Sequence, residues 1–190
     1  CGFGRSGQTL ARFMAQEEVS YVALDLDPER VREAGAAGEN VVFGDAARRE
    51  ALVAAGVTRA SVLIVTFADA RAAERILHLV HELKPDLPVV VRTYDDTDME
   101  RLRSAGAAEV VPESLEASMM LASHALVLIG VPINRVLKRV REMRSGRYQL
   151  LRGFFHGQSD REEDVHESEA VRLHSVTMAP GASAIGRALG

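Results

Sequence analysis

The chain has 190 residues, enough for one domain or for one domain and part of another. Its 47% hydrophobic and 26% charged residues are typical of a soluble globular protein. The formal net charge of −4 and the pI near 5.9 argue against a nucleic-acid partner, because proteins that bind nucleic acids usually carry a basic excess. A single cysteine excludes an internal disulfide and fits a reducing compartment.

The first predicted elements are a helix, a strand and a second helix. Apolar residues at helical spacing predict a helix from about Gly4 to Glu17, and the sequence VSYVALDLD predicts a strand from Val19 to Asp27. The second helix begins at Pro28, because Asp27 can cap it and proline suits a first turn, and it extends to about Ala36.

The alternation of strand and helix continues to about residue 130. Strands are expected at 41–43, 62–65, 88–94 and 108–112, and the helices between them are expected around 47–55, 73–83 and 99–102, followed by a long apolar helix from 115 to 129. This order predicts an α/β fold: a Rossmann-like, doubly wound parallel sheet with helices on both faces. The sheet has six strands if one precedes Gly2, and such a sheet needs its first strand in the middle, so we expect a strand before Cys1.

The longest apolar stretch runs from Ser118 to Pro132 and is interrupted by His124. A membrane-spanning helix needs about 20 apolar residues, so this stretch is too short to cross a bilayer. We expect a buried helix here, and we expect any membrane-spanning part to lie outside this chain.

The pattern changes after Pro132. A helix with an apolar stripe and a basic face is expected there; the basic face is either a solvated surface or a contact for an acidic partner or lipid headgroups. The acidic segment 157–170 is expected to be a linker, and 171–190 to begin a further α+β module.

A Gly-x-Gly-x-x-Gly motif stands at the start of the chain, formed by Gly2, Gly4 and Gly7. In nucleotide-binding folds the first glycine permits a tight turn, the second lets the backbone approach a pyrophosphate, and the third lets helix and strand pack closely. The unpaired N–H groups at the helix start then attract the anion. Taken alone, the motif also fits a purely structural turn.

Asp25 strengthens the nucleotide interpretation. It lies 18 residues after Gly7, at the end of the second strand, where an acid can accept hydrogen bonds from ribose hydroxyls. An acid at this position repels a 2′-phosphate, so NAD or an adenosine phosphate is favoured over NADP. Asp27 is expected to cap its helix.

No second catalytic constellation accompanies this motif. The Tyr-x-x-x-Lys pair and the Gly-Lys-Ser/Thr phosphate loop are both missing, and Cys1 is expected to be buried in the incoming strand. His78 and His81 are three residues apart on a helix, but no third ligand stands at a recognisable spacing, so no metal site is expected. We therefore expect the nucleotide to act as a signal.

Several segments together resemble the nucleotide-binding RCK domain, also called KTN or TrkA-N, in the version appended to Kef-type monovalent cation:proton antiporters. They are GFGRSGQ, VALDLDPERV, VVFGDAARREALVAAGV and PVVVRTYDDTDMERLRSAGAAEVVPE, with FGDA and Gly-Ala-x-x-Val-x-Pro-Glu the more specific marks. The segment VRLHSVTMAPGASAIG resembles the opening of the RCK C-terminal (TrkA-C) domain. The resemblance implies a TrkA-N domain over 1–130, a helical extension over 131–156, the linker, and the start of TrkA-C over 171–190.

The resemblance also implies a binding site. The backbone from Phe3 to Gly7 would cradle the phosphates, with Arg5 at the mouth of the loop and Ser6 within it, and Asp25 would hold the ribose. Asp45 and Ala46 would border the adenine. Thr66 and Arg92 would face the same crevice at the carboxyl ends of their strands, although Arg92 could instead pair with Asp95 or Asp96. The implied ligand is NAD or NADH, or alternatively AMP, ADP or ATP.

The resemblance further implies a homodimer through the helices around 115–147 and a membrane-spanning antiporter domain upstream of residue 1. The expected function is then a regulatory domain on the cytoplasmic face of the bacterial inner membrane that gates a potassium efflux or potassium:proton antiporter. Two alternatives stay open: a soluble NAD-dependent oxidoreductase, and a soluble RCK subunit of a separate potassium channel or transporter.

Overall fold

The computed structural model describes residues 1–145 of the chain. The predicted linker (157–170) and the predicted start of a C-terminal domain (171–190) lie outside the described residues, as does the end of the helical extension (131–156).

The first part of the fold alternates helix and strand from the glycine loop onward. Its elements are α1 (Arg5–Gln16), β1 (Ala23–Asp25), α2 (Pro28–Ala36), β2 (Val41–Phe43) and α3 (Arg49–Ala54). Asp27 caps α2, since its carboxylate accepts hydrogen bonds from the N–H groups of Glu29 and Arg30, and Pro28 occupies the first turn as predicted.

The second part follows a short 3₁₀ turn (Val57–Arg59). It contains β3 (Leu63–Val65), α4 (Ala70–Leu83), β4 (Val89–Thr93), α5 (Met99–Ser104) and β5 (Glu109–Pro112). Gly56 and Gly106 both have positive φ and end α3 and α5, as C-terminal glycines do. The predicted alternation is therefore confirmed through β5.

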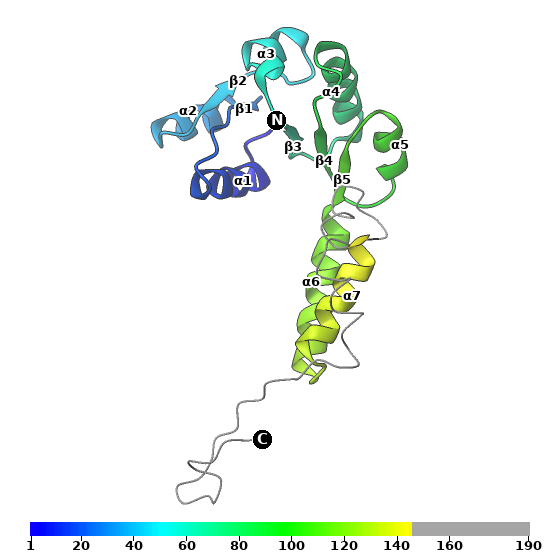
Figure 1. The fold of residues 1–190 in the computed structure, drawn as a ribbon. Helices are drawn as coiled ribbons and strands as arrows, with labels where there is room; N and C mark the ends of the chain where they lie inside the picture. The colour runs from blue at the N-terminus through cyan, green and yellow to red at the C-terminus, as the bar shows by residue number, and fades with distance from the viewer. Residues whose placement is uncertain (146–190) are drawn as a thin grey trace, which may run out of the picture. The chain divides into compact units, whose positions relative to one another are not determined.

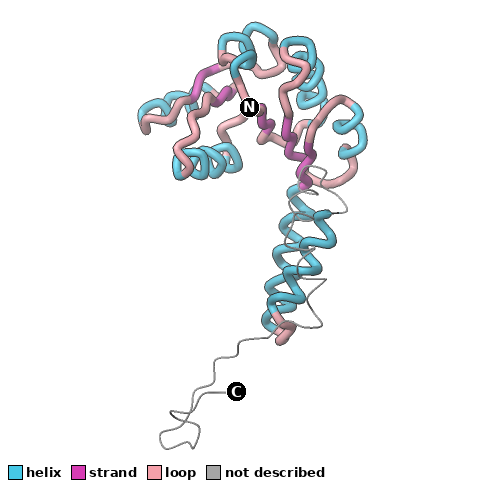
Figure 2. Tube along the Cα trace, in the orientation of Figure 1, coloured by secondary structure: helices cyan, strands magenta, loops and turns pink. Residues whose placement is uncertain are grey.

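All strand pairs are parallel and fall into two groups. β1 pairs with β2, and β3, β4 and β5 pair in that order, with helices on both sides of the strands (Figure 1). The N-terminal segment lies between the two groups (Figure 2). There the Gly2 N–H donates to the Leu24 carbonyl at 2.7 Å, and the Thr66 N–H donates to the Cys1 carbonyl at 2.9 Å. The described residues thus form a Rossmann-like arrangement in which Cys1 and Gly2 join the two strand groups.

The main hydrophobic core lies around β3, β4 and β5. Val65, Ile76, Val91, Leu102 and Val110 have no measurable exposure there. A smaller cluster forms around β1 and β2, with the members Phe3, Ala11, Ala23, Ala34 and Val41. Because small side chains dominate it, this cluster buries less apolar area than the first.

β1 is shorter than the predicted strand, which ran from Val19 to Asp27. Its partner β2 has only three residues, so only Ala23–Asp25 find ladder partners on that side. Val22, predicted to lie within a strand, is 46% exposed. Val62, the first residue of the strand predicted at 62–65, likewise lies outside the observed strand: it precedes β3 and is 41% exposed.

The chain leaves the sheet through α6 (Glu113–Leu128) and α7 (Ile133–Ser145), which lie side by side (Figure 1). The prediction that the first of these helices is buried is wrong. Met119 is its only fully buried residue, whereas Leu121 and Leu128 are 73% and 86% exposed. The helix is apolar on nearly all sides, but within the described residues α7 covers only one side of it. No helix within residues 1–145 combines the length and the apolar character needed to cross a bilayer.

Candidate functional site

The glycine loop adopts a conformation that side chains would not permit. Gly2 has φ +92°, and a Cβ built on it would lie 2.6 Å from Thr66 Oγ1. A Cβ on Gly7 would lie 2.3 Å from the Gly2 carbonyl oxygen. Gly2 therefore makes the tight turn, and Gly7 allows the first turn of α1 to touch the incoming backbone, as the motif predicts.

Gly4 differs from the other two because its surroundings are open. No heavy atom lies within 4 Å of a Cβ built on it, and its φ of −69° suits any residue. It is the N-cap of α1 and provides no capping side chain, and no acidic residue lies in the first turn. The N–H groups of the first turn, including those of Arg5 and Ser6, therefore have no helical partner and can bind an anion. Arg5 is exposed beside them.

Asp25 is buried next to this loop, with 6% of its surface exposed. Its Oδ2 accepts a hydrogen bond from the Phe3 N–H at 2.5 Å, and its Oδ1 accepts from the Asp27 N–H and from Arg30 Nη1, both at 2.8 Å. Burial alone would raise the pKa of Asp25, but these hydrogen bonds outweigh it and lower the pKa below its ordinary value. The carboxylate is therefore charged at neutral pH and held rigidly against the glycine loop.

The predicted adenine-bordering residues follow β2. The Gly44 N–H donates to the Asp25 carbonyl, so the end of β2 lies beside the end of β1. The Asp45 carboxylate accepts a hydrogen bond from the Ala47 N–H at 2.9 Å and lies 3.7 Å from Arg48 Nε. The Ala46 side chain is buried in the main core, so only its backbone is available to a ligand.

Thr66 and Arg92 come from the ends of β3 and β4. Thr66 Oγ1 donates to the Gly2 carbonyl at 2.8 Å, which ties the end of β3 to the glycine loop. Arg92 Nη1 donates to the Thr66 carbonyl at 2.8 Å, and its Nη2 pairs with Glu113. Arg92 therefore forms an ion pair, as one of the predicted alternatives held, but its partner is Glu113 and not Asp95 or Asp96. The reason is the register, which sets Arg92 beside Val111 on β5, two residues before Glu113.

The structure thus brings most of the predicted residues to one edge. The glycine loop, Asp25 and Thr66 are in direct hydrogen-bond contact, and Arg92 joins them through the Thr66 carbonyl. Asp45 and Ala46 follow the neighbouring strand. All of them lie at or just beyond the carboxyl ends of parallel strands, where sheets of this kind bind ligands. Arg30, whose Nη1 donates to Oδ1 of Asp25, was not predicted as a site residue. Its position in the first turn of the helix that follows Asp25 could have indicated this contact.

Other candidate residues do not converge. His78 and His81 are exposed on α4, and residues 1–145 contain no group of three or more potential metal ligands. His124, which interrupts the apolar stretch, is exposed on α6. The carboxyl-edge site is therefore the functional candidate within the described part of the chain.

Comparison with known proteins identifies the family of this chain. The sequence matches the TrkA-N domain family over residues 1–113. The chain belongs to the TrkA-N domain family. One curated relative of this TrkA-N chain, a putative K⁺ efflux antiporter KefB from Alkalimonas amylolytica, is 43% identical over 99% of the chain. The chain spans only 28% of that relative's length.

Two solved structures resemble the TrkA-N chain at identities above 25%. The Kef CTD of Shewanella denitrificans in an AMP-bound form has a TM-score of 0.65 and 27% identity, with coverage of 76% of this chain and 87% of that one. The TrkA-N domain of the inner membrane protein ybaL from Escherichia coli has a TM-score of 0.61 and 26% identity, covering 64% of this chain and 90% of that one.

Proposed function

We propose that this TrkA-N chain is a regulatory domain that binds an adenine nucleotide and thereby gates a potassium efflux antiporter. The observation that carries the proposal is the open first turn of α1 next to a rigidly held carboxylate. Phosphates would bind at the N–H groups after Gly4, and the ribose would bind at Asp25. The relative named KefB supports the transporter assignment.

AMP is the first ligand to test, because the similar Kef CTD of Shewanella denitrificans was solved with AMP. NAD or NADH is the second, since the three glycines and Asp25 match the dinucleotide fingerprint. ADP and ATP remain alternatives of the same class. Arg30 shares Oδ1 of Asp25, so a ribose hydroxyl must either share this oxygen with Arg30 or displace it.

In this proposal the nucleotide is an effector and not a reactant. The groups at the carboxyl edge are backbone N–H groups, the carboxylates of Asp25 and Asp45, the Thr66 hydroxyl, and the guanidinium groups of Arg5, Arg30 and Arg92, the last already paired with Glu113. These groups can bind and orient a nucleotide, but no residue is assigned as an acid, base or nucleophile. Reproducible hydride transfer from NADH to common oxo substrates, catalysed by this chain, would overturn the proposal that the nucleotide is only an effector.

The domain would act as a homodimer at the cytoplasmic face of the inner membrane, attached to an antiporter domain. The exposed apolar residues of α6 and α7 support the dimer, because an apolar patch of this kind usually marks an interaction surface. They are Met120, Leu121, Val127 and Leu128 of α6, Ile129 directly after it, and Ile133 and Leu137 of α7. A ligand changes the balance between two arrangements of the dimer only if it binds them with different affinity.

Isothermal titration calorimetry with AMP, ADP, ATP, NAD, NADH and NADP tests nucleotide binding. AMP or NAD(H) should bind the wild-type chain, and Asp25→Asn should weaken binding by about tenfold, because one charge-assisted hydrogen bond to the ribose is lost. Asp86→Asn is the matched control, since Asp86 is an exposed aspartate before β4, at the opposite edge of the sheet. Absence of binding by every nucleotide would leave the glycine loop as a structural turn.

A further inference from the structure

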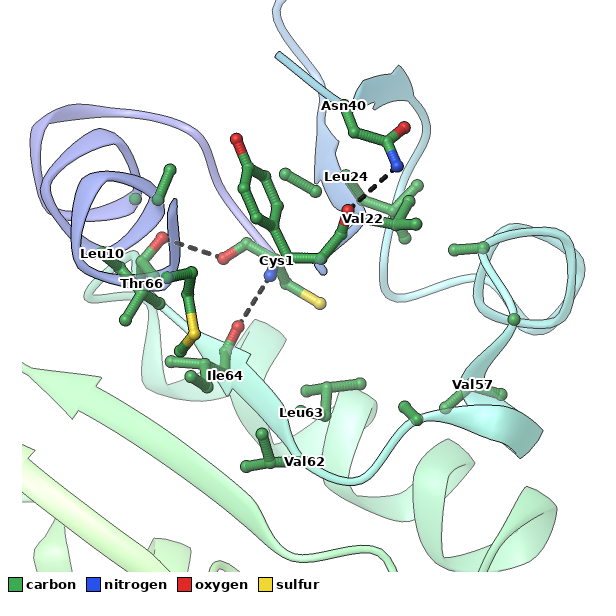
Figure 3. A pocket seen from close by; sticks show the side chains of 18 of the residues that line it. Cys1, Leu10, Val22, Leu24, Asn40, Val57, Val62, Leu63, Ile64 and Thr66 are labelled. Atoms are coloured by element: carbon green, nitrogen blue, oxygen red, sulfur yellow. Dashed lines mark hydrogen bonds between the residues drawn. The ribbon is translucent and has the colours of Figure 1, made fainter. Parts of the chain in front are cut away.

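The Arg92 side chain lies between the glycine loop and the first turn of α6. Its Nη1 donates to the Thr66 carbonyl at 2.8 Å, and its Nη2 pairs with Glu113. Figure 3 shows the Thr66 hydroxyl turned toward the Cys1 carbonyl oxygen, which lies 3.0 Å away, and the hydroxyl is also 2.8 Å from the Gly2 carbonyl oxygen. Through Thr66, the guanidinium is therefore connected to the glycine loop on the side of β3 and β4.

The two halves of the carboxyl edge would receive different parts of a nucleotide. In the proposed site Asp25, at the end of β1, holds the ribose, and the N–H groups after Gly4 hold the first phosphate. Ligands of such sheets lie across the crevice outside the carboxyl ends of the strands. Phosphates beyond the first would therefore lead away from the ribose, toward the ends of β3 and β4, where Arg92 lies.

The loops on this half of the edge are acidic. The loop after β3 (66–69) and the loop after β4 (94–98) contain no lysine or arginine. Their acidic residues are Asp69, Asp95, Asp96 and Asp98. Arg92 is the basic residue that β3, β4 and β5 bring to this half, and its charge is already offset by Glu113. A second phosphate would therefore meet negative charge here unless Arg92 leaves its partner.

We propose, on the basis of the proposed nucleotide site, that Glu113 makes this site selective for a nucleotide with one phosphate, by holding Arg92 in an ion pair. ADP and ATP must open the pair to place their second phosphate, and they also bring that phosphate toward the Glu113 carboxylate. AMP has no second phosphate and leaves the pair closed. Glu113 thus acts as a repulsive element that discriminates between ligands of one class.

The ion pair is accessible enough for a ligand to open it. The Arg92 side chain is 27% exposed and that of Glu113 is 50% exposed. A pair with this exposure is worth at most about a factor of five in an equilibrium constant. The bond from Nη1 to the Thr66 carbonyl keeps the guanidinium at the edge when Nη2 leaves Glu113. Glu113 should therefore lower the affinity for ADP without preventing its binding.

Glu113→Gln tests this selectivity, because it removes the competing charge and keeps the size of the side chain. In titration calorimetry the affinity for ADP should rise about fivefold, and the affinity for AMP should change less than about twofold. Glu116→Gln is the matched control, since Glu116 lies in the same first turn of α6 but pairs with Arg144. It should change the affinities for AMP and ADP alike, by less than about twofold.

The gain in ADP affinity must depend on Arg92. In an Arg92→Gln background, Glu113→Gln should raise ADP affinity no more than Glu116→Gln does in the wild-type background. A full gain in that background would point to another cation, such as the exposed Arg71 of α4, and would overturn the proposal. A loss of ADP affinity in Glu113→Gln alone would also overturn it, because Glu113 would then position Arg92 for the phosphate.

AMP binding separates this selectivity from the nucleotide site itself. If AMP binds the wild-type chain and the ratio of ADP to AMP affinity is the same in Glu113→Gln, the role given to Glu113 is wrong and the nucleotide site stands. If neither nucleotide binds the wild-type chain or any variant, the selectivity and the proposed function are both wrong.

Discussion

Single residues of the glycine loop have separable roles. Gly7 has no space for a side chain, because the Gly2 carbonyl oxygen would lie 2.3 Å from its Cβ. Gly4 has space and an ordinary φ, so neither packing nor the backbone requires glycine there, and the proposed approach of a phosphate gives a reason for a small residue. This difference allows folding and binding to be tested separately.

Gly4→Ala should lower the free energy of unfolding by no more than about 1 kcal/mol, since the added methyl meets open space and the cost comes only from alanine being a poorer N-cap than glycine. It should weaken AMP binding about tenfold or more, because the methyl group would stand where the proposed site brings a phosphate to the backbone. Gly7→Ala should instead lower the free energy of unfolding by about 1–3 kcal/mol through overpacking. Urea denaturation and titration calorimetry on both variants measure the two effects. Unchanged AMP affinity in Gly4→Ala would contradict the assigned phosphate position.

Asp25 should make stability depend on acid pH. Its folded-state pKa is lowered by hydrogen bonds, so it contributes stability above the ordinary aspartate pKa of about 3.9, and this contribution is lost as the pH falls through the folded-state pKa. Asp25→Asn should therefore be less stable than wild type at pH 7 by about 1–3 kcal/mol, with a difference that shrinks toward pH 3. Urea denaturation between pH 3 and 7 measures this. A difference that does not depend on pH would show that the charge is unimportant.

At the scale of elements, α6 runs from the edge of the sheet to α7, with which it forms the exposed helix pair. It begins at Glu113, which pairs with Arg92, and Arg92 in turn contacts the Thr66 carbonyl beside the glycine loop. Further along, Glu116 pairs with Arg144 of α7 at 2.6 Å. A continuous set of contacts therefore joins the candidate nucleotide site to the proposed dimer surface.

The exposed leucines of α6 are predicted to form the dimer interface. Changing both Leu121 and Leu128 to Glu should abolish dimerisation and leave the monomer stable, because both side chains are exposed within the single chain. Val53→Glu on α3 is the control, since Val53 is also an exposed apolar residue, with 49% exposure. Sedimentation equilibrium measures the assembly state. A dimer that persists in the double variant would place the interface elsewhere.

At the scale of the whole molecule, the prediction concerns transport. In the full-length protein, Gly4→Ala should raise by about tenfold the AMP concentration that gives a half-maximal effect on potassium efflux. The increase should match the loss of AMP affinity. The control variant Asp86→Asn should regulate potassium efflux at the same AMP concentrations as wild type. Potassium flux from membrane vesicles at a series of AMP concentrations measures this. If Gly4→Ala binds AMP weakly and yet regulates normally, the nucleotide is not the regulatory signal.

The order of helices and strands, the cap at Asp27 and the roles of Gly2 and Gly7 could be determined from the sequence alone. Each depends on neighbours close along the chain, such as a proline in a first turn or glycines at a fixed spacing. The approach of Asp25 to the glycine loop was also predictable, because both lie at the carboxyl ends of strands in a parallel sheet.

Only the tertiary structure decided the pairing of Arg92 with Glu113 and the exposure of α6. The pairing depends on strand register, which brings together residues 21 positions apart. Apolar composition cannot distinguish a helix buried in its own chain from one left exposed for a partner.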